Sequence, residues 1–162
     1  MSHVNTVDNA QSSISASVFW EEIKTSMNGI SNYSPKDTND KWVFAEVNVS
    51  NSSGDLLDTS DSYLGSSTAV ATGDKIHWIC IKVVSTTSTD GVGIVLDAGT
   101  AAYNVGDGIF IGADEMVILK PANTTVADLH AIAVTMDGDY GYPSGTHGAN
   151  VLVQVAAILD DV

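Results

Sequence analysis

The sequence is poor in cysteine, proline and basic residues, and each shortage narrows what the chain can be. Its single cysteine, Cys80, excludes an intramolecular disulfide framework. Only three prolines interrupt it, so long uninterrupted strands are permitted. No apolar run approaches the roughly 18 residues that span a bilayer. Six Lys and Arg residues face 20 Asp and Glu, for a net charge of −14, so we expect neither nucleic acid nor membrane as a partner.

The ends of the chain and its length suggest one intracellularly made unit. The first ten residues lack the cationic and apolar regions of a signal peptide, which indicates synthesis and folding in a cytoplasm. A chain of 162 residues corresponds to one domain. Cys80 lies in the apolar run 76–84, and this position predicts a buried structural thiol rather than a nucleophile.

Strand patterns dominate after residue 41. Residues 42–49 alternate, with Val43, Ala45, Val47 and Val49 on one face, and residues 150–159 alternate likewise, with Val151, Val153, Val155 and Ala157 inward. Further strands are predicted at 67–71, 74–85, 92–96, 109–111, 116–120 and 129–136. The connectors at 112–115 and 121–124 are typical of turns between neighbouring antiparallel strands. The expected fold is all-β: an antiparallel, jelly-roll-like β-sandwich of about eight strands.

The first forty residues are less clear. Residues 1–17 are polar and nearly uncharged, and we expect a flexible N-terminal arm there, followed by a single domain over 18–162. Residues 17–27 favour a short helix, because Ser17 suits an N-cap and Phe19, Ile23 and Met27 recur every four residues. An extended strand over 14–20 is the alternative.

Five side chains are the candidates for contacts with a partner. Phe19 and Trp20 adjoin the arm and are placed to anchor on a neighbouring subunit, with packing on their own domain as the alternative. Tyr140, Tyr142 and His147 belong to the glycine-dense segment 137–150, where we expect an exposed loop tip.

The spacing of acidic residues and histidines in the sequence gives little support for a metal, cofactor or catalytic site. Asp55, Asp58 and Asp61 recur every three residues but lack the ligand spacing of a calcium loop, and a solvated acidic loop is the preferred interpretation. Asp137, Asp139 and His147 have no spacing that fixes a metal geometry. The four histidines are scattered, at positions 3, 77, 130 and 147. We therefore expect no catalytic residue, no cofactor and no metal site.

The amino-acid sequences of three segments resemble those of a known protein family. Residues 106–120, residues 123–132 and residues 153–162 resemble small virion structural proteins of tailed bacteriophages, particularly marine ones, and residues 74–82 fit the same pattern. The family comprises capsid decoration, or head auxiliary, proteins.

The resemblance implies a non-enzymatic cement protein on the exterior of a phage capsid. It also implies a homo-oligomer, with a trimer favoured, and the major capsid protein as the partner. The rival hypothesis is a glycan- or receptor-binding β-sandwich of a tail fibre or adhesin, in which Trp20, Tyr140 and Tyr142 would stack on sugars.

Overall fold

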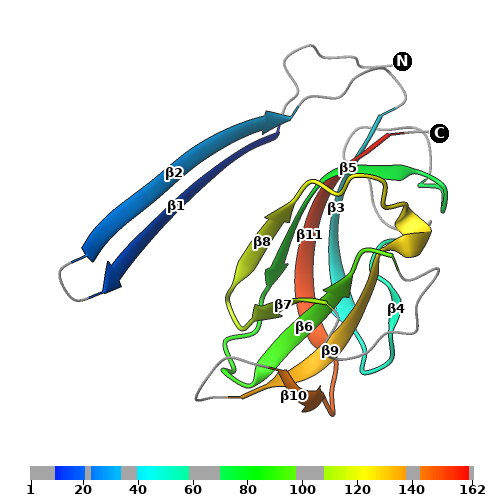
Figure 1. The fold of residues 1–162 in the computed structure, drawn as a ribbon. Coiled ribbons are helices and arrows are strands. Elements are labelled where there is room, and N and C mark those ends of the chain that lie inside the picture. The colour runs from blue at the N-terminus through cyan, green and yellow to red at the C-terminus, as the bar shows by residue number, and fades with distance from the viewer. Residues whose placement is uncertain are drawn as a thin grey trace.

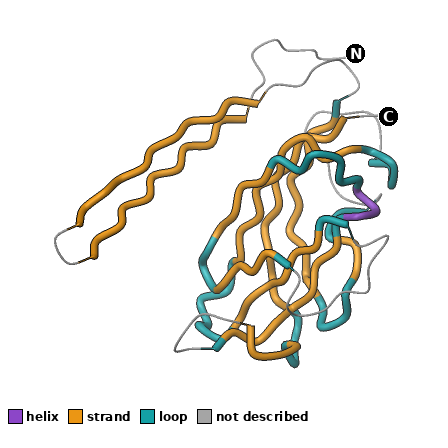
Figure 2. Tube along the Cα trace, viewed as in Figure 1, coloured by secondary structure: helices purple, strands orange, loops and turns teal. Residues whose placement is uncertain are grey.

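Strands make up almost all of the regular structure. The computed structural model describes residues 10–20, 23–33, 40–58, 70–97, 108–137 and 143–160. The strands are β1 (Ala10–Trp20), β2 (Ile23–Tyr33), β3 (Lys41–Val49), β4 (Gly54–Asp55), β5 (Lys75–Val83), β6 (Asp90–Val95), β7 (Ile109–Gly112), β8 (Met116–Leu119), β9 (His130–Met136), β10 (Pro143–Thr146) and β11 (Val151–Asp160). The helical element among the described residues is one 3-10 turn, η1 (Val126–Asp128) (Figure 2).

Two antiparallel sheets pack face to face in a sandwich (Figure 1). One has the order β3-β11-β5-β8, and the other has the order β10-β9-β6-β7, with β4 also paired to β9. When the short β10 is set aside, the first and last sandwich strands pair, as do the second and seventh, the third and sixth, and the fourth and fifth. This pairing is that of a jelly roll, so the expected jelly-roll-like sandwich is confirmed.

The core lies between the two sheets and follows the alternation of the sequence. Val43, Ala45 and Val49 of β3 are buried there, and Val47 packs against them half-buried. All four predicted inward residues of β11 are buried (Val151, Val153, Val155 and Ala157). Directly paired residues of β3 and β11, such as Val153 and Val47, lie on the same face, so both strands contribute to one apolar layer.

Residues 106–136 differ from the expectation in how their strands connect. β7 pairs with β6 in one sheet, whereas β8 pairs with β5 in the other. The connector 112–115 therefore crosses between sheets and is not a hairpin turn; Asp114 has a φ of 57° within it. The Glu115 carboxylate accepts a hydrogen bond of 2.8 Å from the Gly112 backbone N–H and holds this crossing in place. β8 and β9 also lie in different sheets.

The N-terminal expectation of a helix is wrong. β1 and β2 pair residue by residue, from Ala10 with Tyr33 to Trp20 with Ile23, in a hairpin that extends away from the sandwich (Figure 1). The four-residue spacing across 19–27 fits a helix, but those residues stand on two paired strands. Residues 10–17 of the expected arm are paired strand as well, and the sandwich begins near residue 40 rather than 18. Residues 1–9 lie outside the described part.

Three short features were not anticipated. β4 falls at the start of the expected acidic loop, β10 falls in the expected loop 137–150, and a bulge interrupts the pairing of β5 with β11 between Ile158 and Leu159. The bulge shifts the faces of β5, so that Ile76 and Ile79 both point inward and Trp78 points outward. Most of the strand expected at 67–71 lies outside the described residues.

One buried ion pair joins the start of β3 to the residue before β5. Lys41 Nζ lies 2.7 Å from Asp74 Oδ2, and both side chains are only 1% exposed. The same carboxylate oxygen accepts a 2.8 Å hydrogen bond from the backbone N–H of Ala71. Because β3 and β5 are not neighbours in their sheet but flank β11, the pair links two strands across the central one.

We expect Lys41→Met to lower the free energy of unfolding by about 3–5 kcal/mol, because it leaves the Asp74 carboxylate buried without its cation. Lys82→Met is the matched control: it breaks the exposed pair of Lys82 with Asp114 and should cost less than about 1 kcal/mol. The double variant Lys41→Met/Asp74→Asn should recover most of the loss. Urea denaturation measures all three, and equal losses in the two single variants would contradict this account.

Candidate functional site

The five residues singled out from the sequence do not converge on one site. Phe19 and Trp20 are the last residues of β1, beside the turn of the hairpin, with their backbones paired to Lys24 and Ile23. Tyr140 and Tyr142 lie outside the described residues. His147 follows β10, at the far end of the sandwich.

His147 is held inside a hydrogen-bonded group rather than presented at a loop tip. Its Nε2 atom lies 3.1 Å from Asp90 Oδ1, and its Nδ1 atom lies 2.9 Å from the carbonyl oxygen of Ala149. The other oxygen of Asp90 accepts a 2.5 Å hydrogen bond from the Ser85 hydroxyl. Both the His147 and Asp90 side chains are less than one-fifth exposed. The group fastens the β10–β11 connection to the start of β6, which is a structural task.

A second histidine group has the order hydroxyl, imidazole, carboxylate. Asp55 and His130 are direct cross-strand partners of β4 and β9, with Asp55 Oδ1 2.8 Å from His130 Nε2. Ser53 Oγ lies 3.3 Å from His130 Nδ1. A nucleophilic serine also needs a buried orienting acid and oxyanion donors. Here Asp55 is half exposed and Ser53 is exposed, so we interpret the group as a pin that fastens the two-residue β4 to β9.

The sequence did not reveal this pair because 75 positions separate Asp55 from His130. Among the described residues, no three His, Cys, Asp or Glu side chains are placed to hold a metal ion. Asp61 and Asp139, members of the two acidic clusters considered above, lie outside the described residues. No described helix combines the length and apolar character of a membrane span.

The hairpin has one apolar and one polar face. Directly paired residues share a face, so Ile14, Ala16, Met27 and Tyr33 lie together, on the same face as Ser12, Thr25 and Gly29. We call the first four residues the hairpin apolar face. Ile14 is 56% exposed and Met27 is 63% exposed. Among the side chains that the structure describes, the opposite face carries serine, asparagine and glutamine together with Ile30, which is 70% exposed (Gln11, Ser13, Ser15, Ser17, Ser26, Asn28, Ile30 and Asn32).

The outer face of the β3-β11-β5-β8 sheet is also apolar at the end nearer the hairpin. Two rows of paired residues cross it, and we call them the outer apolar patch (Trp42, Ile158 and Trp78; then Phe44, Ala156, Cys80 and Ile118). The next row is polar in three of its four residues (Glu46, Gln154 and Lys82, with Met116 at the β8 edge), and Gln154 donates a 2.9 Å hydrogen bond to Glu46. Trp78 and Ile158 are buried although they point away from the core, whereas Phe44 is 46% exposed.

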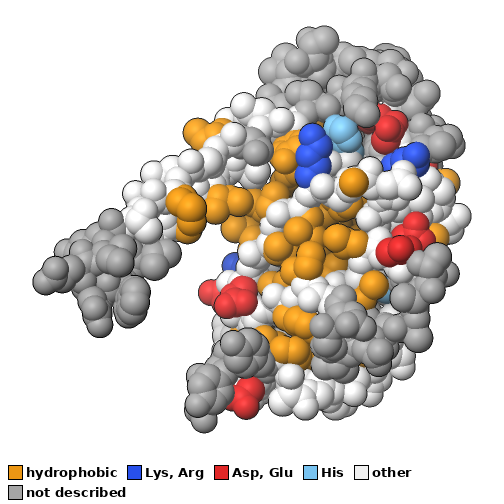
Figure 3. Space-filling model, in the orientation of Figure 1, with side chains coloured by type: hydrophobic (Ala, Val, Ile, Leu, Met, Phe, Trp, Pro, Cys, Tyr) orange, Lys and Arg blue, Asp and Glu red, His pale blue; other side chains and the backbone are white. Residues whose placement is uncertain are grey.

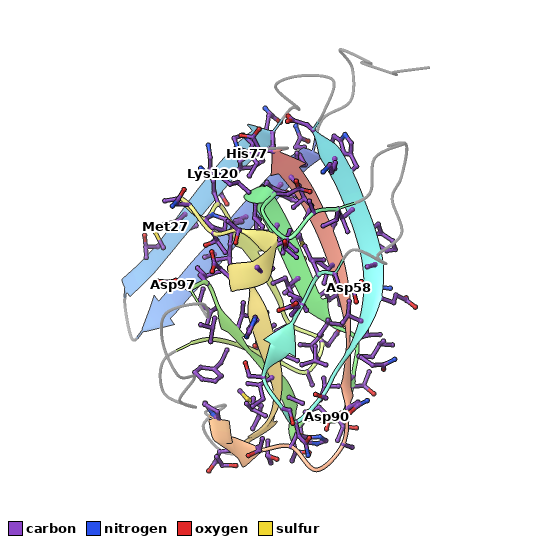
Figure 4. The ribbon with its side chains drawn as sticks, turned by 90° about the vertical axis from the view of Figure 1, so that its right-hand side faces the viewer. Met27, Asp58, His77, Asp90, Asp97 and Lys120 are labelled. Atoms are coloured by element: carbon purple, nitrogen blue, oxygen red, sulfur yellow. The ribbon has the colours of Figure 1, made fainter. Side chains whose placement is uncertain are left out.

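Within the described part of the chain, these two apolar surfaces touch at the base of the hairpin. The Tyr33 ring lies 5.8 Å from the Trp78 ring, and Lys120 Nζ lies 5.4 Å from the centre of the Tyr33 ring. Lys120 and His77 lie at this end of the sandwich, and Asp90 lies at the other (Figure 4). Hydrophobic side chains run along the hairpin and gather again on the sandwich beside it (Figure 3). The arrangement suits the binding of an apolar protein surface.

Cys80 stands in the middle of the outer apolar patch. The expected buried thiol is only half-buried, on the outer face of β5 rather than in the core. Burial nevertheless raises the pKa of the Cys80 thiol, since it disfavours the thiolate. The side chain is therefore a weak nucleophile.

Comparison with known proteins adds no relative. No protein-family model matches the chain, and neither the curated proteins nor the solved structures give a significant match. The geometry of the described residues therefore carries the functional argument.

We expect Asp90→Ala to cost about 1–3 kcal/mol of unfolding free energy, because it removes the shared acceptor of Ser85 and His147 in a partly buried position. The control is Asp97→Ala, on an exposed residue, which should change stability by less than about 0.5 kcal/mol. Thermal or urea unfolding of the purified variants provides the measurement. A loss in Asp90→Ala no larger than in the control would show that the His147 group does not hold the connection.

The raised pKa of Cys80 predicts slow alkylation. In dilute protein at pH 8, iodoacetamide should react more slowly with Cys80 than with the thiol of the double variant Cys80→Ser/Ser88→Cys, which stands in an exposed loop. Because the Cys80 thiolate forms at higher pH, its rate should go on rising with pH after the control rate has levelled off. Mass spectrometry of quenched samples gives both rates; coincident pH profiles would refute the shift.

Proposed function

We propose that this chain is a non-enzymatic structural protein of a tailed phage: a capsid decoration protein that binds the outer surface of the head and stabilises contacts between capsomers. The observation that carries the proposal is the pair of apolar surfaces, on the hairpin and on the sheet next to it. Surfaces of this kind serve assembly with other proteins. The two histidine groups of the described part, in contrast, fasten the chain to itself.

The fold and the charge are compatible with a place on the outside of a capsid. Jelly rolls are common in viral capsid proteins and in lectins. A net charge of −14 disfavours contact with packaged DNA and keeps the free protein soluble. The resemblance of residues 106–120 and 153–162 to head auxiliary proteins supports the same assignment, with the major capsid protein and further copies of the chain as partners.

A cement protein must bind a shell that has reached its mature form. We therefore expect the purified chain to co-sediment in fixed stoichiometry, at hundreds of copies per particle, with expanded, DNA-free heads of the phage that encodes it. Bound heads should also resist urea better than bare heads, because binding to the assembled state stabilises it. Unexpanded heads serve as the control.

Two results would overturn this function. Absence of binding to expanded heads is the first. The second is retention of the chain on host-cell glycans together with only a few copies per virion, which would assign it to a tail fibre or adhesin.

A further inference from the structure

The hairpin is incomplete as a structural unit. A two-stranded sheet by itself is at best marginally stable in water. β1 and β2 pack extensively on one another, and beyond them no described strand is an extensive neighbour. Ile14 and Met27 of the hairpin apolar face consequently remain more than half exposed. Stable folding of the hairpin therefore calls for another surface that packs on this face and buries these side chains.

The chain does not supply that cover from its own sandwich. The hairpin touches the outer apolar patch through Tyr33 and Trp78 and then leads away from it (Figure 1). If the hairpin lay on its own patch, Met27 and Phe44 would both be buried, yet they are 63% and 46% exposed. With 11 residues per strand, the hairpin is about 36 Å long, which is enough to reach a neighbouring molecule.

Charge identifies a second copy of this chain as the fitting occupant. The chain carries 20 acidic residues, but neither β1 nor β2 contains one, and Glu21 and Glu22 come between the two strands in the sequence. The seven residues of the outer apolar patch are all uncharged. Two copies would repel one another across most of their surfaces. They can approach without burying a carboxylate where a hairpin of one meets a patch of the other.

The dimensions fit as well. The hairpin is a strip two strands wide, and the sheet that carries the patch is four strands wide. Sheets that pack face to face stand about 10 Å apart, so the strip can form a third layer on the sandwich. Each copy supplies one strip and accepts another, and a closed ring or reciprocal pair would leave no hairpin uncovered.

We propose that copies of this chain associate by hairpin exchange, in which the hairpin apolar face of one copy covers the outer apolar patch of another. The inference rests on the proposed function for its expectation that copies meet, and it deepens that function by naming the surface. The contact places Ile14 and Met27 of one copy over Phe44, Cys80 and Ile118 of the other.

Introduction of a negative charge on either face of the hairpin tests the exchange. Ile14→Asp and Met27→Asp place a carboxylate on the apolar face, and Ser15→Asp and Asn28→Asp place one on the neighbouring position of the polar face. Each variant adds the same charge to the same strand. On the patch, Phe44→Asp is matched by Asn48→Asp, farther along the outer face of β3.

Sedimentation velocity over a range of concentrations should show the unaltered chain as a closed oligomer. Ile14→Asp, Met27→Asp and Phe44→Asp should each raise the dissociation constant at least about tenfold, because a carboxylate would be buried without a partner. The three controls should stay within about threefold. Circular dichroism and the urea midpoint confirm that each variant keeps the sandwich.

Cys80 reports on the same contact from the patch side. In the unaltered chain its alkylation rate should fall as protein concentration rises through the dissociation constant, because the hairpin of a second copy covers the thiol. In Met27→Asp the rate should remain at its dilute value over that range, and in Asn28→Asp it should fall as in the unaltered chain.

The outcomes separate this inference from the proposed function. An oligomer in which Ile14→Asp, Met27→Asp and Phe44→Asp behave like their controls overturns hairpin exchange and leaves the binding of heads untouched. Hairpin exchange is also overturned if the chain sediments as a monomer at every concentration. This holds even if Cys80 is protected in that monomer by the hairpin of the same copy. Exchange with no binding to expanded heads overturns the proposed function alone.

Discussion

The sandwich depends on the insertion of β11 between β3 and β5. Each residue from Val151 to Leu159 pairs with β3, and most of the same strand pairs with β5 on its other side. Without β11, the sheet would separate into β3 alone and the pair β5 and β8. Because β3 and β11 stand about as far apart in the chain as two strands of this domain can, their pairing demands a long-range closure, which slows folding.

The same insertion explains where sequence reasoning succeeded. A strand with one face in the core must alternate, and β3 and β11 do so through Val43, Ala45, Val153 and Val155. Their positions and inward faces could therefore be predicted. The sheet to which each strand belongs could not, since β7 and β8 are separated by a turn-like connector and yet belong to different sheets. The sheet to which a strand belongs is determined by long-range pairing, which local sequence patterns do not predict.

The hairpin shows how two periodicities can compete. Phe19, Ile23 and Met27 satisfy a helical spacing, whereas Ile14 and Ala16 alternate with serines as a strand would. The structure follows the second pattern because all of β1 can pair with β2. This alternation was the strongest sequence signal for the exposed apolar face of the hairpin. On β5 the bulge turns Ile76 into the core, while Trp78 and Cys80 face outward. Unbroken alternation groups positions 76, 78 and 80 on one face and therefore does not separate the patch from the core.

The distribution of charge gives the surfaces their significance. In a chain of net charge −14, self-repulsion is the default between copies, and any contact must be built where carboxylates are missing. Glu46 and Lys82 mark where the patch ends, since both stand in the first polar row below it. Because most of the surface is acidic, two copies repel one another in most orientations. The orientation that brings a hairpin onto a patch avoids this repulsion. Apolar burial then supplies the affinity, and charge restricts the geometry.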